Sequence, residues 1–357
     1  MNNNDQYQKK LSDIPVSVLD LAAILEGKTP ADTFKNSADL AQHAELWGFK
    51  RYWLAEHHSM ESIASSATSV LIGYIAGQTS SIRVGSGGIM LPNHSPLVIA
   101  EQFGTLESLY PGRIDLGLGR APGSDQLTAR ALRRNLQEGP NDFPESVMEL
   151  KKYFSAENNA SKIRAIPGEG LDVPVWLLGS STYSAQLAAI LGLPFAFASH
   201  FAPAYLFEAL KVYRQTFQPS ENLKKPYALA CINVIAADTG HEADYLATSL
   251  YQLAMRIING TSTPLQPPVE NMDEIWNDYE KAAILQMMQY TFIGEPQTVK
   301  AKLLEFLNKT QVDEVMITSH IYDHSAKVHS YEIVSEIWKE KEFAGNEAIL
   351  NDVFNLL

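Results

Sequence analysis

Eight short apolar runs constrain the fold of this chain more than any other feature of its 357 residues. The runs lie at 16–20, 51–55, 82–90, 113–118, 173–178, 195–199, 227–236 and 312–318, and most are separated by an amphipathic segment of helix length. Repeated strand–helix units predict a parallel sheet with right-handed crossovers. Eight such units favour a closed (β/α)₈ or TIM barrel. A competing open sheet would carry a Gly-x-Gly-x-x-Gly turn after its first strand, and none follows Asp20.

Capping residues mark where several of the expected helices begin and end. Thr29 and Pro30 predict the start of the first helix, because threonine is a good N-cap and proline fits the first turn. Gly48 predicts its end. The pair Glu295-Pro296 predicts the start of the helix before the last strand.

The segment between the seventh and eighth runs is too long for one helix. It contains a polar, proline-rich loop at 261–268 between helices expected at 242–258 and 273–290, so we predict an insertion at about 258–292. A mobile lid and a plain surface loop are both compatible with this segment. Two helices within 325–357 would close the outside of the barrel, and the whole chain, 1–357, is interpreted as one domain.

Bulk composition predicts a soluble cytoplasmic protein. The net charge of −13 disfavours a broad nucleic-acid surface. The one cysteine, Cys231, excludes an internal disulfide, favours a reducing compartment, and lies in an apolar run typical of an inert buried thiol. The first ten residues contain no apolar signal segment, and no apolar run approaches the ~20 residues of a membrane span, so no membrane partner is expected.

Function in a barrel lies at the carboxyl ends of the strands, so the residues after each run are the candidates. Polar or glycine residues follow six of the runs: Asp20; Glu56, His57 and His58; Gly87, Gly88 and His94; Gly119 and Arg120; Ser180, Ser181, Tyr183 and Ser184; and His200. Convergence from six separate strands on one rim is hard to attribute to packing alone.

An anion site is expected where the fourth and fifth strands end. Arg120 offers a forked, bidentate grip, and the hydroxyls of Ser180–Ser184 open a helix whose free N–H groups attract negative charge. The alternative is plain N-capping by one serine. Gly87-Gly88 would let a flat ligand lie against the main chain, although a β-bulge would also explain this pair.

The histidines suggest proton transfer rather than metal binding. Adjacent residues on an extended chain point in opposite directions, so one of His57 and His58 is expected to face the mouth and the other the wall. Imidazole titrates near neutrality and suits acid–base work, although a structural histidine pair is the alternative. No His-x-x-x-His pattern or carboxylate cluster supports zinc, so no metal is expected. Asp20 is interpreted as either a rim residue or a helix cap.

Three stretches of the chain resemble the bacterial luciferase-like monooxygenases, a family of flavin-dependent (β/α)₈ barrels. They are Trp53-Leu54-Ala55-Glu56-His57-His58, the segment from Gly85 to Arg120 with Gly112-Arg113-Ile114, and Leu178-Gly179-Ser180-Ser181 through Gly192-Leu193-Pro194. The likeness spans about 15–331. Leu116-Gly117-Leu118-Gly119-Arg120-Ala121-Pro122-Gly123 and Ser199-His200-Phe201-Ala202-Pro203 are most similar to an uncharacterised bacterial subgroup of the family.

The resemblance implies reduced FMN as co-substrate. In such proteins O2 adds at flavin C4a, and the resulting peroxide attacks a small organic compound such as an aldehyde or ketone. By position, Arg120 with Ser180, Ser181, Tyr183 and Ser184 would bind FMN, and Gly87-Gly88 falls where the family often has a non-proline cis peptide. His57 would be the catalytic acid or base, with Asp20, His58 and His200 as further rim residues. A partner flavin reductase using NAD(P)H and a homodimer are also implied.

Two departures from luciferase stand out. Gly119 replaces a reactive cysteine and Ser180 replaces a phosphate-site glutamate, so light emission is not expected. Two other functions stay open at this stage. One is a deazaflavin (F420)-dependent dehydrogenase of the same superfamily, which needs no oxygen. The other is a non-catalytic flavin-binding or storage protein, which needs no proton donor at its rim.

Overall fold

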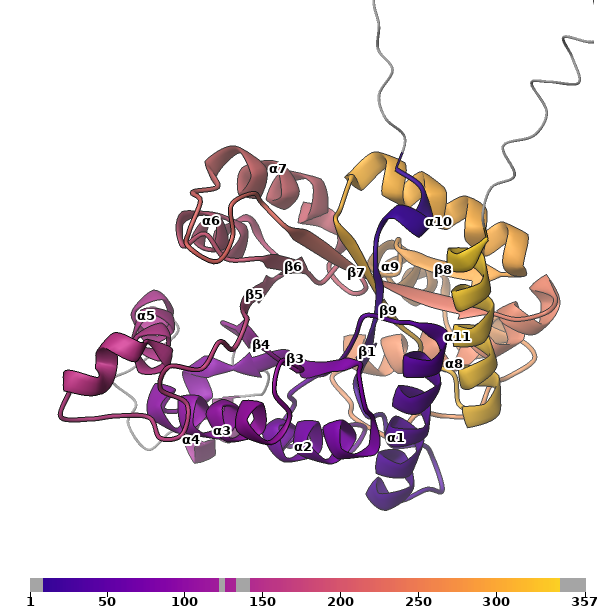
Figure 1. Cartoon of the computed structure of the whole chain (residues 1–357). Helices are drawn as coiled ribbons and strands as arrows, with labels where there is room; N and C mark the ends of the chain where they lie inside the picture. Colours follow the sequence, from indigo (N-terminus) through magenta and orange to yellow (C-terminus); the bar gives the residue numbers. More distant parts are fainter. Residues whose placement is uncertain (1–8, 122–125, 133–141, 341–357) are drawn as a thin grey trace, which may run out of the picture.

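The computed structural model describes residues 9–121, 126–132 and 142–340 (Figure 1). Within them, one parallel sheet contains nine strands. These are β1 (Val16–Asp20), β2 (Arg51–Leu54), β3 (Arg83–Met90), β4 (Ile114–Gly119), β5 (Val175–Gly179), β6 (Phe195–Phe197), β7 (Ala228–Ala236), β8 (Thr291–Gly294) and β9 (Glu314–Thr318).

Eight of these strands close into a barrel. Their order is β6-β5-β4-β3-β2-β1-β9-β7, and a direct pairing of β6 with β7 joins the two ends. Every pairing in the register is parallel, as right-handed strand–helix repeats require. The predicted (β/α)₈ barrel is confirmed, and its eight strands coincide with the eight apolar runs.

The sequence reasoning missed the ninth strand, β8. It predicted a helix that ends at residue 290 and no strand between this helix and the run that begins at residue 312. The helix is shorter, α9 (Asp278–Met287), and β8 follows it. β7 has nine residues but β6 only three, so β6 pairs with the first part of β7 and β8 pairs with Asn233–Ala236 beyond it. β8 contains only two apolar residues, Phe292 and Ile293, so no apolar run marks it, and the free edge of β7 is a tertiary feature.

Helices lie around the outside of the strands (Figure 1). They are α1 (Pro30–Trp47), α2 (Thr68–Gln78), α3 (Pro96–Leu109), α4 (Gln126–Leu132), α5 (Phe143–Phe154), α6 (Thr182–Ile190), α7 (Leu206–Thr216), α8 (Gly240–Ile258), α9, α10 (Pro296–Thr310) and α11 (His324–Lys339). None of the helices in the described ranges is long and apolar enough to cross a membrane.

The predicted caps are confirmed where they were specified. Thr29 and Asp32 form a capping box at the start of α1, and Gly48 ends this helix in the left-handed conformation. α10 begins at Pro296 after Glu295. The last helix predicted from the sequence, at about 346–357, lies outside the described residues.

The amino-terminal end of the barrel is filled by buried charge. Arg51, the first residue of β2, pairs with Asp115 of β4 and with Glu314 of β9, at 2.7 Å in each case. Trp53 donates its indole N–H to the same Asp115 carboxylate at 3.1 Å. Because these side chains fill the amino-terminal end, the carboxyl ends of the strands are where the described part of the barrel can hold a site.

Candidate functional site

A cavity of about 460 Å³ opens at the carboxyl ends of the barrel strands. Its volume is typical of a site for a small organic molecule or cofactor. The barrel strands contribute its floor, through side chains such as Leu19, Trp53, Cys231 and Met316. The strand-to-helix loops and the insertion after β7 contribute its walls.

One region of the cavity is suited to an anion. Arg120 directly follows β4, and Ser180 and Ser181 directly follow β5, which is its neighbour in the barrel. All three residues line the cavity together with Ser184 of α6. Ser181 occupies the N-cap of α6, but its side chain makes no capping hydrogen bond. Ser181 therefore holds the N-cap position without the side-chain bond of plain N-capping, and its hydroxyl forms no hydrogen bond within the described ranges.

The Arg120 side chain is held by an aromatic ring rather than by a carboxylate. Its guanidinium carbon lies 4.3 Å from the centre of the Tyr183 ring. Within the described part of the chain, Arg120 forms neither a hydrogen bond nor an ion pair. Tyr183 itself is 39% exposed and does not line the cavity. Tyr183 thus contacts the arginine and not the cavity.

Gly87 and Gly88 form the wall next to this anion site. The peptide bond between them is cis, as the family resemblance implies, and the register of β3 with β4 shifts between Ser86 and Ile89. A Cβ on Gly88 would lie 2.7 Å from the Gly117 carbonyl oxygen. The pair is therefore a strand irregularity, as the β-bulge alternative expected, and its backbone also lines the cavity.

The two adjacent histidines point in different directions, as expected for an extended chain. His57 lines the cavity. His58 turns away, and its Nε2 lies 2.8 Å from Oε1 of Glu56. His58 was predicted as a rim residue, but it is not among the residues that line the cavity.

Glu56, which precedes His57 in the sequence, is the centre of a buried hydrogen-bond network. Its Oε1 also lies 2.8 Å from Nε2 of His94, and its Oε2 accepts a hydrogen bond from the Met90 amide. Burial opposes the ionisation of Glu56, but hydrogen bonds from His94 and His58 hold its pKa below the usual range. The ligand-type atoms of Glu56, His58 and His94 lie within 4.8 Å of one another, a spacing that an ion could also bridge. We interpret the trio as a network that joins the loop after β2 to β3.

The structure adds two polar residues that the sequence reasoning missed. His320 follows β9 by two residues, and Asn233 lies within β7; both line the cavity together with the predicted His200. The rule that examines residues after each strand would have found His320 if it had been applied to the last strand. Asn233 has no such signal, because it lies inside a continuous apolar run.

Asp20 does not line the cavity. Its carboxylate accepts hydrogen bonds from Ser37 at 2.5 Å and from Tyr52 at 2.7 Å. Burial by itself raises the pKa of Asp20, but the ammonium of Lys327, 3.3 Å away, and the hydrogen bonds outweigh burial and lower it to about 2. Neither sequence interpretation of Asp20 is correct, because the N-cap of α1 is Thr29.

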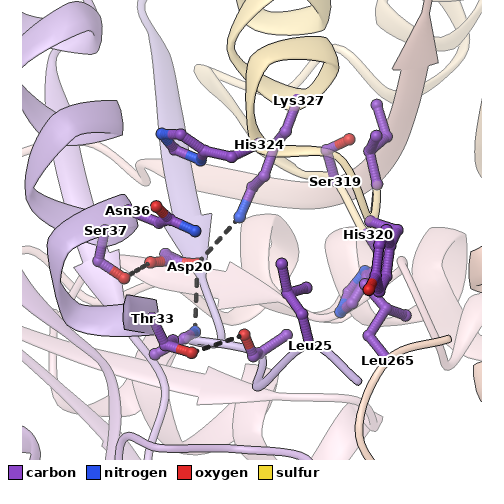
Figure 2. Close-up of a pocket in the computed structure, with 14 residues that line it drawn as sticks. Asp20, Leu25, Thr33, Asn36, Ser37, Leu265, Ser319, His320, His324 and Lys327 are labelled. Atoms are coloured by element: carbon purple, nitrogen blue, oxygen red, sulfur yellow. Dashed lines mark hydrogen bonds and ion pairs between the residues drawn. The ribbon is translucent and has the colours of Figure 1, made fainter. Parts of the chain in front are cut away.

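A small second pocket of about 30 Å³ lies beside the main cavity (Figure 2). Figure 2 shows Asp20 in this pocket between Ser37 and Lys327, with His320 across from it. His320, Leu265 and Ala23 line both spaces. Asp20 is therefore separated from the cavity by the wall that carries His320.

Comparison with known proteins agrees with this architecture. A family profile described as luciferase-like monooxygenase matches residues 14–314. YvbT of Bacillus subtilis (strain 168) is 58% identical over 342 residues, which cover 96% of this chain and 100% of YvbT. A luciferase-like monooxygenase of Escherichia coli (strain K12) is 53% identical over 327 residues, which cover 92% of this chain and 98% of that protein. N-acetyl-S-alkylcysteine monooxygenase of Bacillus subtilis (strain 168) is 33% identical over 329 residues, covering 90% and 98%.

Solved structures show the same fold. The crystal structure of apo-MsnO8 superposes with a TM-score of 0.82 at 31% identity, covering 92% of this chain and 99% of that one. The oxygenating constituent of 3,6-diketocamphane monooxygenase of Pseudomonas putida, in complex with FMN, shares the fold at 19% identity and a TM-score of 0.67, covering 90% and 97%. An F420-dependent secondary alcohol dehydrogenase shares the fold at 13% identity and a TM-score of 0.68, and the match covers 92% of this chain and 100% of that one. The resemblance read from the sequence is thereby confirmed, and the chain belongs to the luciferase-like monooxygenase family.

Proposed function

We propose that this protein is a monooxygenase that uses reduced FMN and O2 to oxidise a small organic substrate of aldehyde or ketone type. The observation that carries the proposal is the Arg120 guanidinium, which has no hydrogen bond or ion pair within the described residues, beside the serine hydroxyls at the start of α6 and at one side of a largely apolar cavity. A guanidinium, hydroxyls and helix N–H groups together are well suited to a phosphate.

The residues present fit FMN. Arg120, Ser180, Ser181 and Ser184 would hold the phosphate, and the bare backbone of Gly87-Gly88 would leave room for a flat ring. When bound, reduced FMN supplies the electrons with which O2 is activated. The protein side chains bind and orient the reactants and keep water out through the apolar lining of the cavity.

His57 is the residue that we assign to proton transfer. His57 lines the cavity, and the residue before it in the sequence is Glu56, the centre of the buried hydrogen-bond network. An imidazole at the cavity wall can hold or move a proton at one of its ring nitrogens. The burial of Cys231 raises the pKa of its thiol, so this cavity residue is not assigned a nucleophilic role.

Names of relatives support the reaction class. One relative is an N-acetyl-S-alkylcysteine monooxygenase, and one structural neighbour is a Baeyer–Villiger monooxygenase constituent in complex with FMN. The F420-dependent alcohol dehydrogenase with the same fold keeps a deazaflavin reaction as the second candidate. The histidines around the cavity disfavour a storage protein, because storage needs no proton donor. A cytoplasmic homodimer supplied with reduced flavin by an NAD(P)H-dependent reductase completes the proposal.

Substitution of Arg120 tests the phosphate assignment. Arg120→Ala removes a charge-assisted contact worth about 1.5–3 kcal/mol, so FMN affinity is expected to fall at least about tenfold, measured by equilibrium dialysis. Riboflavin, which has no phosphate, should bind as before. Lys211→Ala removes one positive charge from an exposed position on α7 and serves as the control. Equal losses for FMN and riboflavin would contradict the assignment.

The choice of cofactor needs a separate measurement. The protein is dialysed against FMN and against F420, and each loaded sample is supplied with reductant and octanal in an oxygen electrode. We expect retention of FMN and oxygen consumption that depends on the aldehyde. Retention of F420 with turnover in the absence of oxygen would establish the dehydrogenase instead. Retention of FMN without any turnover of reduced flavin would favour storage.

A further inference from the structure

The trio of Glu56, His58 and His94 brings three potential metal ligands to one point. One ligand-type atom from each residue lies within 4.8 Å of the other two. Oε1 of Glu56 is 2.8 Å from Nε2 of His58 and 2.8 Å from Nε2 of His94. Among the residues that the structure describes, no other group of three such side chains meets this spacing.

Two neighbouring strand-to-helix segments supply the three side chains. Glu56 and His58 lie just beyond the end of β2. His94 lies between Met90, which ends β3, and Pro96, which begins α3. The rings of the two histidines are inclined by 50° with their centres 6.4 Å apart, so each can present a nitrogen to a point between them. A ligand set drawn from two segments has no short sequence motif, and the sequence therefore did not predict it.

The buried Glu56 carboxylate pairs with no arginine or lysine in the described part of the chain. Its side chain is 1% exposed, and its partners there are the two imidazoles and the backbone amide of Met90. A buried charge is costly unless an opposite charge offsets it. An imidazole does so only when it holds a second proton, whereas a divalent cation does so while both imidazoles stay neutral.

The ligand set selects the kind of ion. Imidazole nitrogen and carboxylate oxygen suit Zn²⁺, whereas Mg²⁺ and Ca²⁺ prefer oxygen ligands alone. Tetrahedral ligands about 2.0–2.1 Å from zinc lie about 3.3 Å apart, so the two 2.8 Å contacts need to lengthen by only about 0.5 Å. The amide of Met90 donates to Oε2 and so orients the carboxylate, as outer-shell hydrogen bonds do in metal sites.

An ion can reach this point from solvent. The side chain of His58 is 14% exposed and that of His94 is 26% exposed, although the carboxylate between them is buried. Three protein ligands also leave room for water, which commonly takes the fourth position on zinc.

We propose that Glu56, His58 and His94 bind one Zn²⁺ ion, each through a single atom, with water completing the coordination. The hydrogen-bonded network is the ion-free state of the same trio. On binding, each imidazole coordinates through Nε2 and keeps its proton on Nδ1, and an imidazole that held two protons releases one to solvent. The ion ties the segment after β2, which carries the cavity residue His57, to the segment before α3. This site is independent of the proposed function.

Zinc binding is measured by isothermal titration calorimetry on protein that was treated with EDTA and holds no flavin. We expect one Zn²⁺ per chain and no binding of Mg²⁺. His94→Gln keeps an N–H donor for Glu56 but removes the imidazole ligand. It should weaken zinc binding at least about a hundredfold, because a ligand contributes at least as much as an outer-shell group. Absence of zinc binding, or an unchanged Kd in His94→Gln, would overturn the proposal.

His329 supplies the matched control. Its Nε2 lies 2.9 Å from Asp238 and its Nδ1 lies 3.1 Å from Glu332, so its two nitrogens face separate carboxylates. His329→Gln should therefore leave the Kd of zinc unchanged, whereas His58→Gln should raise it as His94→Gln does. Equal losses of affinity in His94→Gln and His329→Gln would show that zinc binds elsewhere and would overturn the proposal.

Thermal unfolding tests whether the ion ties the two segments together. An ion that binds only the folded state raises the Tm, so zinc should raise the Tm of the unaltered protein and EDTA should reverse the change. The Tm of His94→Gln should not respond to zinc. An equal rise in both proteins would overturn the proposed site. Because no measurement uses flavin, a failure here leaves the proposed function untouched, and a failure of FMN binding leaves the zinc site untouched.

Discussion

The guanidinium carbon of Arg120 lies 4.3 Å from the centre of the Tyr183 ring. Arg120 lines the cavity, whereas Tyr183 does not. This stacking orients a cation that has no hydrogen bond or ion pair within the described residues. Tyr183 belongs to the first turn of α6, the helix whose start supplies the serine hydroxyls. Tyr183 is therefore placed to position the Arg120 side chain.

Removal of the Tyr183 ring should weaken FMN binding through Arg120. A cation–π contact at a partly exposed site is worth about 0.5–1 kcal/mol, so Tyr183→Leu is expected to lower FMN affinity about two- to fivefold. Tyr183→Phe keeps the ring and should bind FMN nearly as well as the unaltered protein. In an Arg120→Ala background, Tyr183→Leu should have no further effect. FMN affinity is measured by equilibrium dialysis. If Tyr183→Leu lowers FMN affinity equally in the Arg120→Ala background, Tyr183 does not act through Arg120.

Loss of the His57 imidazole should separate binding from turnover. His57→Ala is expected to bind FMN normally and to oxidise octanal at least about 100-fold more slowly, because a positioned acid–base group contributes about 10²–10⁴ in rate. Product formation is followed by gas chromatography, and added imidazole should restore part of the rate. His241→Ala, at an exposed position of α8, is the control. Unchanged turnover in His57→Ala would remove this residue from the mechanism.

The buried Asp20 carboxylate should contribute stability that depends on pH. Its pKa in the folded protein is about 2, below the ordinary value of 3.8, so its contribution is present above about pH 4 and is lost as pH falls toward 2. The difference in pKa corresponds to about 2 kcal/mol at neutral pH. Asp20→Asn is expected to lower the free energy of unfolding by about this amount at pH 7, measured with urea.

The same comparison at low pH supplies the check. The gap in the free energy of unfolding between the unaltered protein and Asp20→Asn should narrow as the pH approaches 2, since the carboxylate is then protonated in the unfolded state and increasingly protonated in the folded state. Asp39→Asn is the control, because Asp39 pairs with His324 but its side chain is 47% exposed, and such pairs contribute little. A gap that stays constant with pH would mean that charge is not the source of the Asp20 contribution.

Two glycines of the cavity wall should differ in their tolerance of alanine. A Cβ on Gly88 would lie 2.7 Å from a backbone carbonyl oxygen, whereas a Cβ on Gly119 would meet the flexible thioether of Met90 at 2.7 Å. Gly88→Ala is expected to cost about 1–3 kcal/mol in the free energy of unfolding, because backbone must move. Gly119→Ala should cost clearly less, since a methionine side chain can adapt. Equal costs in urea unfolding would contradict this explanation.

Local patterns anticipated most of the barrel. The N-cap at Thr29 and the helix end at Gly48 were predicted from residue types alone, because caps depend on a few neighbouring positions. β8 could not be read in this way. Its four residues pair with the part of β7 that extends beyond β6, and the length of that free edge is set by strands far apart in the sequence.

The candidate site also has a part that local sequence patterns predicted and a part that they did not. Arg120 and the serines before α6 could be placed together, because parallel strands that neighbour one another in a barrel end at the same rim. The direction in which an individual side chain points could not be predicted from the sequence. Asp20 and His320 both lie at strand ends, yet Asp20 turns toward Ser37 and Lys327, while His320 reaches the cavity.

The sequence by itself determined the fold class, the family and the strand ends at which the site lies, because hydrophobic periodicity, caps and motifs are local properties of the chain. The tertiary structure decided which polar groups share the cavity and which are consumed elsewhere. It paired Asp20 with Lys327 of α11, stacked Tyr183 on Arg120, and placed the apolar face of α8 in the wall of the cavity that His200 also lines. The physical reason is that hydrogen-bond partners and burial depend on contacts between residues remote in sequence, and only closure of the barrel creates those contacts.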